Sequence, residues 1–250
     1  MLKLPDEIRE AYSQTETAEK YIDKRFTSAW GSVVHAAQVR VVNEVIRSHA
    51  VKRVLEIAPG PARISRDVSG FDRGYLCEFN DSMLQMARHR LAGGTDRWRM
   101  VRGDAFRLPF ARRADLDMVY TFRFIRHFEA ADRATLYGEI RRVLKDGGLF
   151  VCDAVNMDVG LPWFHREGPN RQRIYDEFYK PQTLNQELVD HGFRLLSLTD
   201  VIRHMGLQQQ IQVLVGPRSK ALARGLISLL EYFPGQPLEW VVVGQKMPTQ

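Results

Sequence analysis

The stretch "VLEIAPGPARIS", residues 54–65, decides which fold the rest of the chain must follow. A short apolar run stops at the acid Glu56, and the chain then turns through a Pro-Gly-Pro sequence. This pattern predicts a buried strand followed by a tight turn, because Gly and Pro interrupt regular structure. Gly60 can take a positive φ, and Ala58 and Ala62 are the next smallest choices. The turn therefore lets the backbone come close to a ligand.

Strand-like runs alternate with helical patterns on the C-terminal side of this stretch. The strands are expected at "GYLCEF" (74–79), "RWRMVRGD" (97–104), "LDMVYTF" (116–122), "LFVCDAV" (149–155), "FRLLSLTDVI" (193–202) and "LEWVVVGQK" (238–246). Asp81 or Ser82 is expected to cap the helix after the second strand. Strand and helix alternate over about 120 residues, which predicts βαβ units and a mostly parallel sheet covered on both faces.

Acidic residues end the first three predicted strands. In an open α/β sheet, ligands bind outside the carboxyl ends of the strands, where Glu56, Glu78 and Asp104 stand. Glu78 is well placed to accept hydrogen bonds from both hydroxyls of a ribose. Asp104 can accept from an exocyclic adenine amine, while Ala105 and Phe106 offer backbone and a flat face. Together these residues predict a pocket for an adenosine group.

The turn excludes two common nucleotide-binding motifs. A dinucleotide fingerprint would place glycines at 58, 60 and 63, but only Gly60 matches, and Arg63 would obstruct the close strand–helix contact. A phosphate-binding P-loop is also excluded, because no Gly-rich turn ends in Lys-Ser or Lys-Thr.

The ordered motifs resemble those of class I S-adenosylmethionine-dependent methyltransferases over roughly residues 50–156 plus the terminal strand. That family's first motif is an acid followed by alternating glycines. It stands here as "EIAPGPA", with alanine at two of the three glycine positions. "CEFNDSMLQMA", "GDAFRLPF", "DMVYTFRFIRHF" and "EIRRVLKDGGLFVCDAVN" resemble the motifs that follow. The resemblance implies an α/β, Rossmann-like, seven-stranded sheet with an antiparallel last strand, helices on both faces and a small helical or irregular cap.

The resemblance also implies in-line methyl transfer from S-adenosyl-L-methionine to a small-molecule acceptor, with S-adenosyl-L-homocysteine as product. Glu56 is expected to orient groups around the methionine amino end of the cofactor, directly or through water. Cofactor contacts are expected from Tyr21, Arg25, Glu56, Ala58, Gly60, Pro61, Glu78, Phe79, Met83, Asp104, Ala105, Phe106, Thr121 and Phe122.

Three further regions have weaker assignments. His127 is the expected catalytic base, since a neutral imidazole can take a proton near pH 7; the alternative is a helix-start histidine bonded to backbone. Residues 1–30 are expected to form an arm over the cofactor, in which Tyr21 covers the methionine portion and Arg25 pairs with its carboxylate, or else an exposed helix. Residues 157–182 are the expected substrate cap. Their aromatic and basic side chains suit an acidic or aromatic acceptor, or are plain core.

Composition bounds the remaining possibilities. The chain of 250 residues suits a single methyltransferase domain, and it has no long apolar membrane segment and no apolar signal core. Two cysteines in predicted strands favour reduced thiols in a cytoplasmic protein. No metal site is expected. An amphipathic helix over 219–233 is a candidate packing or homodimer face.

The formal net charge of +6 allows a nucleic-acid partner but does not establish one. The basic residues are scattered, and "TFRF" replaces the Asn/Asp-Pro-Pro-aromatic motif of base amino-methylating enzymes. A nucleic-acid, in particular RNA, methyltransferase is therefore the first alternative, and a non-catalytic cofactor-binding module is the second.

Overall fold

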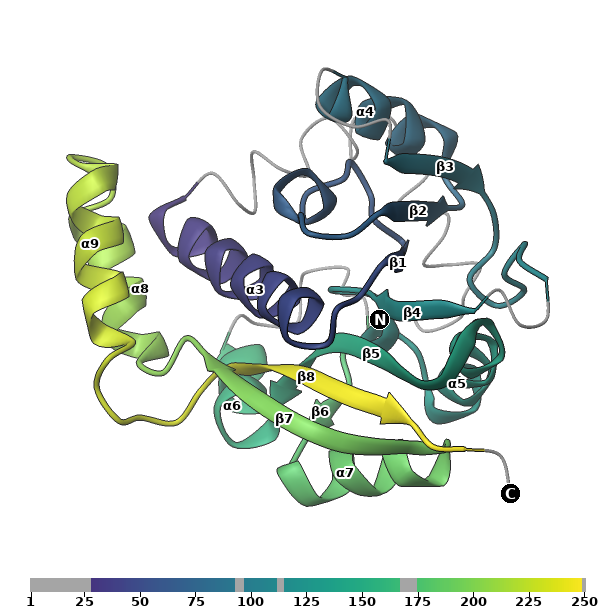
Figure 1. The fold of residues 1–250 in the computed structure, drawn as a ribbon. Coiled ribbons are helices and arrows are strands. Elements are labelled where there is room, and N and C mark those ends of the chain that lie inside the picture. Colours follow the sequence, from purple (N-terminus) through teal and green to yellow (C-terminus); the bar gives the residue numbers. More distant parts are fainter. Residues whose placement is uncertain (1–27, 93–96, 112–114, 167–174, 249–250) are drawn as a thin grey trace.

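The computed structural model describes residues 28–92, 97–111, 115–166 and 175–248, which build one sheet flanked by helices (Figure 1). Its order is β3-β2-β1-β4-β5-β8-β7, and β6 pairs with β5 beside this path. The predicted seven-stranded sheet is confirmed, with the two-residue β6 as an addition. The strands are β1 (Arg53–Ile57), β2 (Arg73–Glu78), β3 (Trp98–Arg102), β4 (Leu116–Tyr120), β5 (Leu144–Asn156), β6 (Phe178–Tyr179), β7 (Phe193–Val201) and β8 (Glu239–Lys246).

Strand direction follows the prediction as well. β1 pairs in parallel with β2 and β4, as does β2 with β3 and β4 with β5. β8 is antiparallel to both of its neighbours, β5 and β7. The chain moves outward from β1 to β2 and β3, and then returns to the other side of β1 at β4. This reversal creates a switch point at the carboxyl ends of β1 and β4, where open α/β sheets bind ligands.

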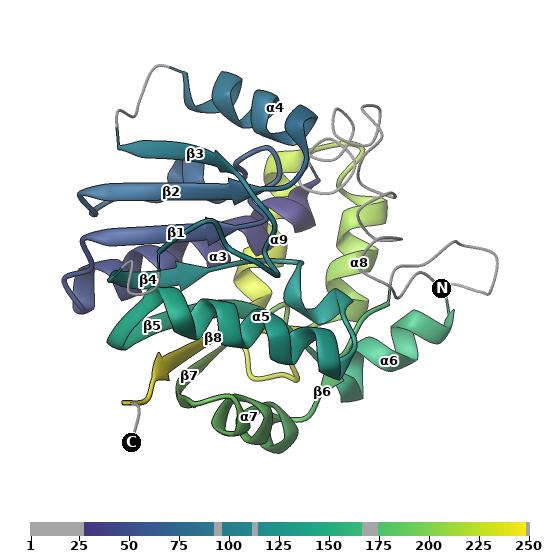
Figure 2. The same cartoon turned by 90° about the vertical axis from the view of Figure 1, so that its right-hand side faces the viewer.

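Helices cover both faces of the sheet, as the buried side chains and the two views show (Figure 2). One face packs against α3 (Ala29–Ser48) and α4 (Asp81–Leu91), and α9 (Lys220–Leu230) packs against α3. The other packs against α5 (Ala130–Val143) and α7 (Pro181–Asp190). The period-two alternation of strands divides β1 between them: Val54 faces the first helix group, and Leu55 and Ile57 face the second.

The start of α4 corrects one expectation. Asn80, and not Asp81 or Ser82, is the N-cap, and its side chain accepts a hydrogen bond from the Met83 backbone N–H at 3.1 Å. Asn80 is still extended (φ −90°, ψ 119°), whereas Asp81 already lies in the helix. The cap must be the last non-helical residue, so the helix begins one residue earlier than expected.

One helix lies in the segment expected to form a helical or irregular cap, and another has no counterpart in the predicted pattern. The segment after β5 begins as α6 (Met157–Arg166), although its sequence reads as irregular and contains Pro162. Residues 205–214 form α8, which packs beside α9. Both helices follow strand ends, α6 after β5 and α8 after β7.

Among the helices within the described ranges, none combines the length and the apolar content needed to cross a membrane.

Candidate functional site

A cavity of about 850 Å³, including its part open to solvent, lies at the carboxyl ends of β1, β2 and β3 and extends along the segment after β4. The lining is Ala58, Gly60, Cys77, Glu78, Phe79, Asn80, Met83, Gly103, Asp104, Ala105, Phe106, Phe122, Arg123, Phe124, His127 and Phe128.

The turn after β1 has alternating left-handed residues. Ala58, Gly60 and Ala62 have φ values of 51°, 54° and 55°. These are the three positions that are glycine in the motif the sequence resembles. A left-handed conformation costs an L-residue about 1–2 kcal/mol. The turn thus keeps its shape with alanine at two positions, and Ala58 and Gly60 bring backbone to the cavity wall.

Glu78 joins the first two strand-end loops. One carboxylate oxygen accepts the Gly60 N–H at 3.0 Å and the other accepts the Asn80 N–H at 3.0 Å. Burial raises the pKa of Glu78, while these backbone hydrogen bonds oppose the rise. The carboxylate is therefore held in one orientation at the cavity wall, with acceptor sites left for a ligand.

The loop after β3 closes the same side of the cavity. Asp104 Oδ1 accepts the Phe106 N–H at 3.0 Å, so the carboxylate and the ring belong to one tight turn. The Phe106 ring meets Phe128 edge to face, with 5.2 Å between centroids. Met83 from α4 and Phe79 supply further apolar wall. Asp104, Ala105, Phe106, Met83 and Phe79 thus come together with Glu78, as the sequence predicts.

Glu56 lies behind the turn and does not line the cavity. Its carboxylate is 3% exposed and accepts a hydrogen bond from the Ser65 hydroxyl. Burial raises the pKa of Glu56 to about 7, and the contact with Ser65 counteracts part of that effect. Pro61 and Thr121 also lie outside the lining, and Thr121 Oγ1 donates to the Ile57 carbonyl at 2.8 Å. These three residues shape the turn and the strand end from outside the cavity.

His127 reaches the cavity from the short helix η2 (Ile125–His127), which follows β4. Its side chain is buried, and Nδ1 lies 2.9 Å from the Tyr175 carbonyl oxygen and 2.9 Å from Asp176 Oδ1. The backbone bond that the alternative interpretation foresaw is therefore present. It holds the ring, and His127 still lines the cavity.

A buried charge network beside His127 escaped the sequence analysis. The Arg126 side chain is 7% exposed, and its guanidinium lies 3.1 Å from both Asp153 Oδ2 and Asp176 Oδ1. Glu239, at the start of β8, lies 3.7 Å from the same guanidinium. Asp153 Oδ1 also accepts the Arg123 N–H at 2.6 Å. The sequence contained one signal for this network. Arg126, in η2, and Asp153, in β5, each stand among apolar residues, and charged residues are rarely buried unless they are paired.

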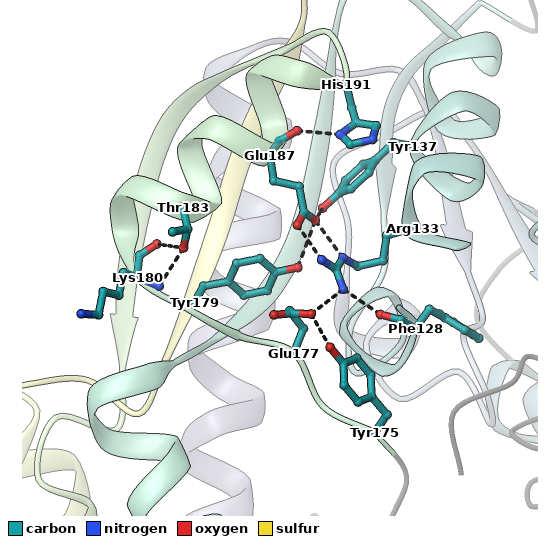
Figure 3. Close-up of polar contacts among 10 residues, drawn as sticks. All are labelled: Phe128, Arg133, Tyr137, Tyr175, Glu177, Tyr179, Lys180, Thr183, Glu187 and His191. Atoms are coloured by element: carbon teal, nitrogen blue, oxygen red, sulfur yellow. Dashed lines mark hydrogen bonds and ion pairs between the residues drawn. The ribbon is translucent and has the colours of Figure 1, made fainter. Parts of the chain in front are cut away.

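A second network ties the segment after residue 174 to α5 and α7 (Figure 3). Arg133 donates to both carboxylate oxygens of Glu187, at 2.9 and 2.7 Å, and to Glu177 at 2.7 Å. The Tyr137 and Tyr179 hydroxyls donate to Glu187 at 2.9 and 3.0 Å. Tyr179 is thus part of the core. Among the described residues of 157–182, the expected substrate cap, none lines the cavity.

Tyr21, Arg25 and nearly all of the expected arm over residues 1–30 lie outside the described residues. The same holds for residues 167–174 of the expected cap.

Comparison with known proteins gives a consistent picture. Residues 54–148 match the model of a family described as "Methyltransferase domain". Sterol 24-C-methyltransferase ERG6B of Gibberella zeae is 30% identical over 102 residues, which are 39% of this chain. The matched segment spans 26% of that relative's length.

Solved structures share the fold across nearly the whole chain. The complex of the Haloferax volcanii Trm112 methyltransferase activator with a methyltransferase matches with a TM-score of 0.65 at 18% identity, covering 97% of this chain and 99% of that one. The DhpI complex with S-adenosylhomocysteine matches with 0.65 at 17%, covering 96% and 95%. Magnesium protoporphyrin IX methyltransferase of Synechocystis, also solved with S-adenosylhomocysteine, matches with 0.64 at 11%, covering 96% and 98%.

Proposed function

We propose that this chain, whose residues 54–148 form a methyltransferase domain of the class I, S-adenosylmethionine-dependent type, transfers a methyl group to a small-molecule acceptor. One observation carries the proposal. Glu78 from the end of β2 and His127 from η2 line the same cavity, so a carboxylate suited to ribose hydroxyls and an ionisable side chain meet in one largely apolar space.

The residues present fit the adenosine part of the cofactor. Glu78 uses one site on each oxygen for backbone N–H groups and keeps others for ribose hydroxyls. Asp104 lines the same cavity and would accept a hydrogen bond from the adenine amine. Phe79 and Met83 supply apolar surface for the flat base. The left-handed turn at Gly60 keeps side chains away from this part of the wall.

Glu56 supports this arrangement from behind. It accepts from Ser65, which follows the turn, so it fixes the turn's exit while Thr121 fixes the end of β1. Glu56 would therefore act on the methionine end of the cofactor indirectly, by fixing the shape of the turn.

When bound, S-adenosylmethionine supplies an electrophilic methyl group on a sulfonium. The chain's residues have to orient the acceptor and exclude water, and orientation alone can contribute on the order of 7–11 kcal/mol. Five phenylalanines line the cavity and make most of its wall apolar. His127 is the residue that would take a proton from the acceptor.

Cofactor binding is tested by isothermal titration of the full chain with S-adenosylhomocysteine. We expect saturable heat, whereas no heat at high micromolar ligand would overturn the proposal.

The acceptor class is tested by incubating the protein with methyl-labelled cofactor and either a low-molecular-mass cell extract or total RNA. Label in the low-mass fraction supports the proposal. Label confined to RNA, with binding that weakens steeply as salt rises, would overturn it.

A further inference from the structure

We propose that Asp176 and the Tyr175 carbonyl hold His127 as the Nδ1–H tautomer, so that its Nε2 accepts a proton from a hydroxyl group of the methyl acceptor. The inference rests on the proposed function and deepens it, because it names the acceptor group and a positioning residue.

Both neighbours of His127 Nδ1 can only accept hydrogen bonds. The Tyr175 carbonyl oxygen is hydrogen-bonded to this nitrogen at 2.9 Å, and Asp176 Oδ1 lies at the same distance as an ion-pair contact without hydrogen-bond geometry. Although burial alone would raise the pKa of Asp176, Arg126 and His127 lower it to about 2, so Asp176 is a carboxylate at neutral pH. With two acceptors facing it, Nδ1 must carry the hydrogen. In the neutral ring, the lone pair is then on Nε2.

The environment of Nε2, the other ring nitrogen, is that expected of a general base whose substrate is not bound. Nε2 is buried and has no hydrogen-bond partner among the residues that the structure describes. His127 is 6% exposed and lines the cavity. A buried polar atom is normally hydrogen-bonded, so an unpartnered nitrogen at a cavity wall points to a group supplied by a ligand.

The segment that carries these acceptors is fixed from two sides. Arg126 Nε lies 3.1 Å from Asp176 Oδ1, and the Arg126 carbonyl accepts the Glu177 N–H at 2.8 Å. Arg133 donates to the Glu177 carboxylate at 2.7 Å, and the Tyr175 hydroxyl donates to the same carboxylate (Figure 3). These contacts keep the Tyr175 carbonyl and the Asp176 carboxylate in place, as a base with a fixed tautomer requires.

A general base that the protein holds in a fixed orientation favours a methyl acceptor with a hydroxyl group. The acceptor oxygen bonds to the methyl carbon while the carbon–sulfur bond of the sulfonium breaks and its electron pair stays on sulfur. The acceptor's proton moves to His127 Nε2, and Asp176 faces the imidazolium that forms. A neutral amine or a thioether attacks without losing a proton first, and a thiol ionises near pH 8.5, whereas a phenol ionises only near pH 10. A base therefore helps a hydroxyl most.

The tautomer is measured on apo protein labelled with ¹⁵N-histidine at pH 8, by long-range ¹H–¹⁵N correlation of the imidazole rings. His127 is assigned with His127→Gln, and the exposed His89 serves as internal reference. We expect the Nδ1–H form to exceed the other by about tenfold or more, since hydrogen bonds to charged groups are the strong ones. A predominant Nε2–H form in the wild type would overturn the proposal.

Two variants separate positioning from structure. Asp176→Ala should reduce the tautomer ratio at least about tenfold, whereas Asp176→Asn, which keeps an acceptor oxygen but loses the charge, should reduce it less. Both should bind S-adenosylhomocysteine like the wild type, so a failure of cofactor binding is recognised separately. An unchanged ratio in Asp176→Ala would show that Asp176 does not position the ring.

The acceptor group is tested by adding phenol, and anisole as a matched compound without the hydroxyl, to the protein saturated with S-adenosylhomocysteine. Phenol should shift the His127 Nε2 resonance and anisole should not. Equal shifts, or no shift with phenol, would refute the hydroxyl assignment.

Discussion

Replacing Glu56 with glutamine removes a buried carboxyl group whose pKa burial raises to about 7. Its ordinary value is 4.5, so the folded protein holds this proton more tightly than the unfolded chain does. The stability that depends on the proton is fully present below pH 4.5. It falls as the pH rises toward 7 and stays low above that. Glutamine has no proton to lose, and the variant should lack this part of the pH dependence.

The size of the effect follows from the two pKa values. Between pH 5 and pH 8, proton linkage at Glu56 costs the wild type roughly 2–3 kcal/mol of unfolding free energy. Urea unfolding followed by tryptophan fluorescence should show that the wild type loses about this much more than Glu56→Gln over that interval. Glu44→Gln, on the exposed face of α3, should follow the wild type. Equal losses in the wild type and Glu56→Gln would refute the reasoning.

Three other predictions concern the cofactor site and the Arg133 network. Gly60→Val forces a β-branched residue to φ +54°. It should abolish S-adenosylhomocysteine binding in calorimetry while the fold is kept. Gly138→Val, which places the new side chain in open space on α5, is the matched control and should bind normally. Glu78→Gln should weaken the same binding by about 10-fold or more, through loss of charged hydrogen bonds; unchanged affinity would place the cofactor elsewhere. Arg133→Met should cost about 3–5 kcal/mol in urea unfolding because it leaves buried carboxylates unpaired, and adding Glu187→Met should recover part of that loss; strictly additive losses would contradict the network.

The local sequence was enough to predict much of the cavity lining. Glu78, Asp104 and Gly60 lie at strand ends or in a turn, where the neighbouring residues in sequence already define the geometry. The parallel sheet then brings successive strand ends to one edge, so these residues meet without further information. This is why the residues expected at the first strand ends line one cavity, while their contacts with a cofactor stay a prediction.

Glu56 shows where the same reasoning stops. The sequence places it at a strand end but does not say whether its carboxylate meets the ligand or the protein. In the fold, the Ser65 hydroxyl reaches it from beyond the turn, and the carboxylate lies behind the wall of the cavity. The direction of a side chain at a strand end depends on what packs against it.

By itself, the sequence determined where the strands lie along the chain, the mostly parallel sheet, the turn at 58–62 and the acids at the first strand ends, because periodicity and turn chemistry are local properties. The antiparallel last strand was implied only by the family resemblance. Only the tertiary structure decided what surrounds His127 and Arg133. Their partners Tyr175 and Glu187 are 48 and 54 residues away in the chain. Contacts at such distances depend on how α5, α7 and the segment before β6 pack together, and no local pattern records that packing.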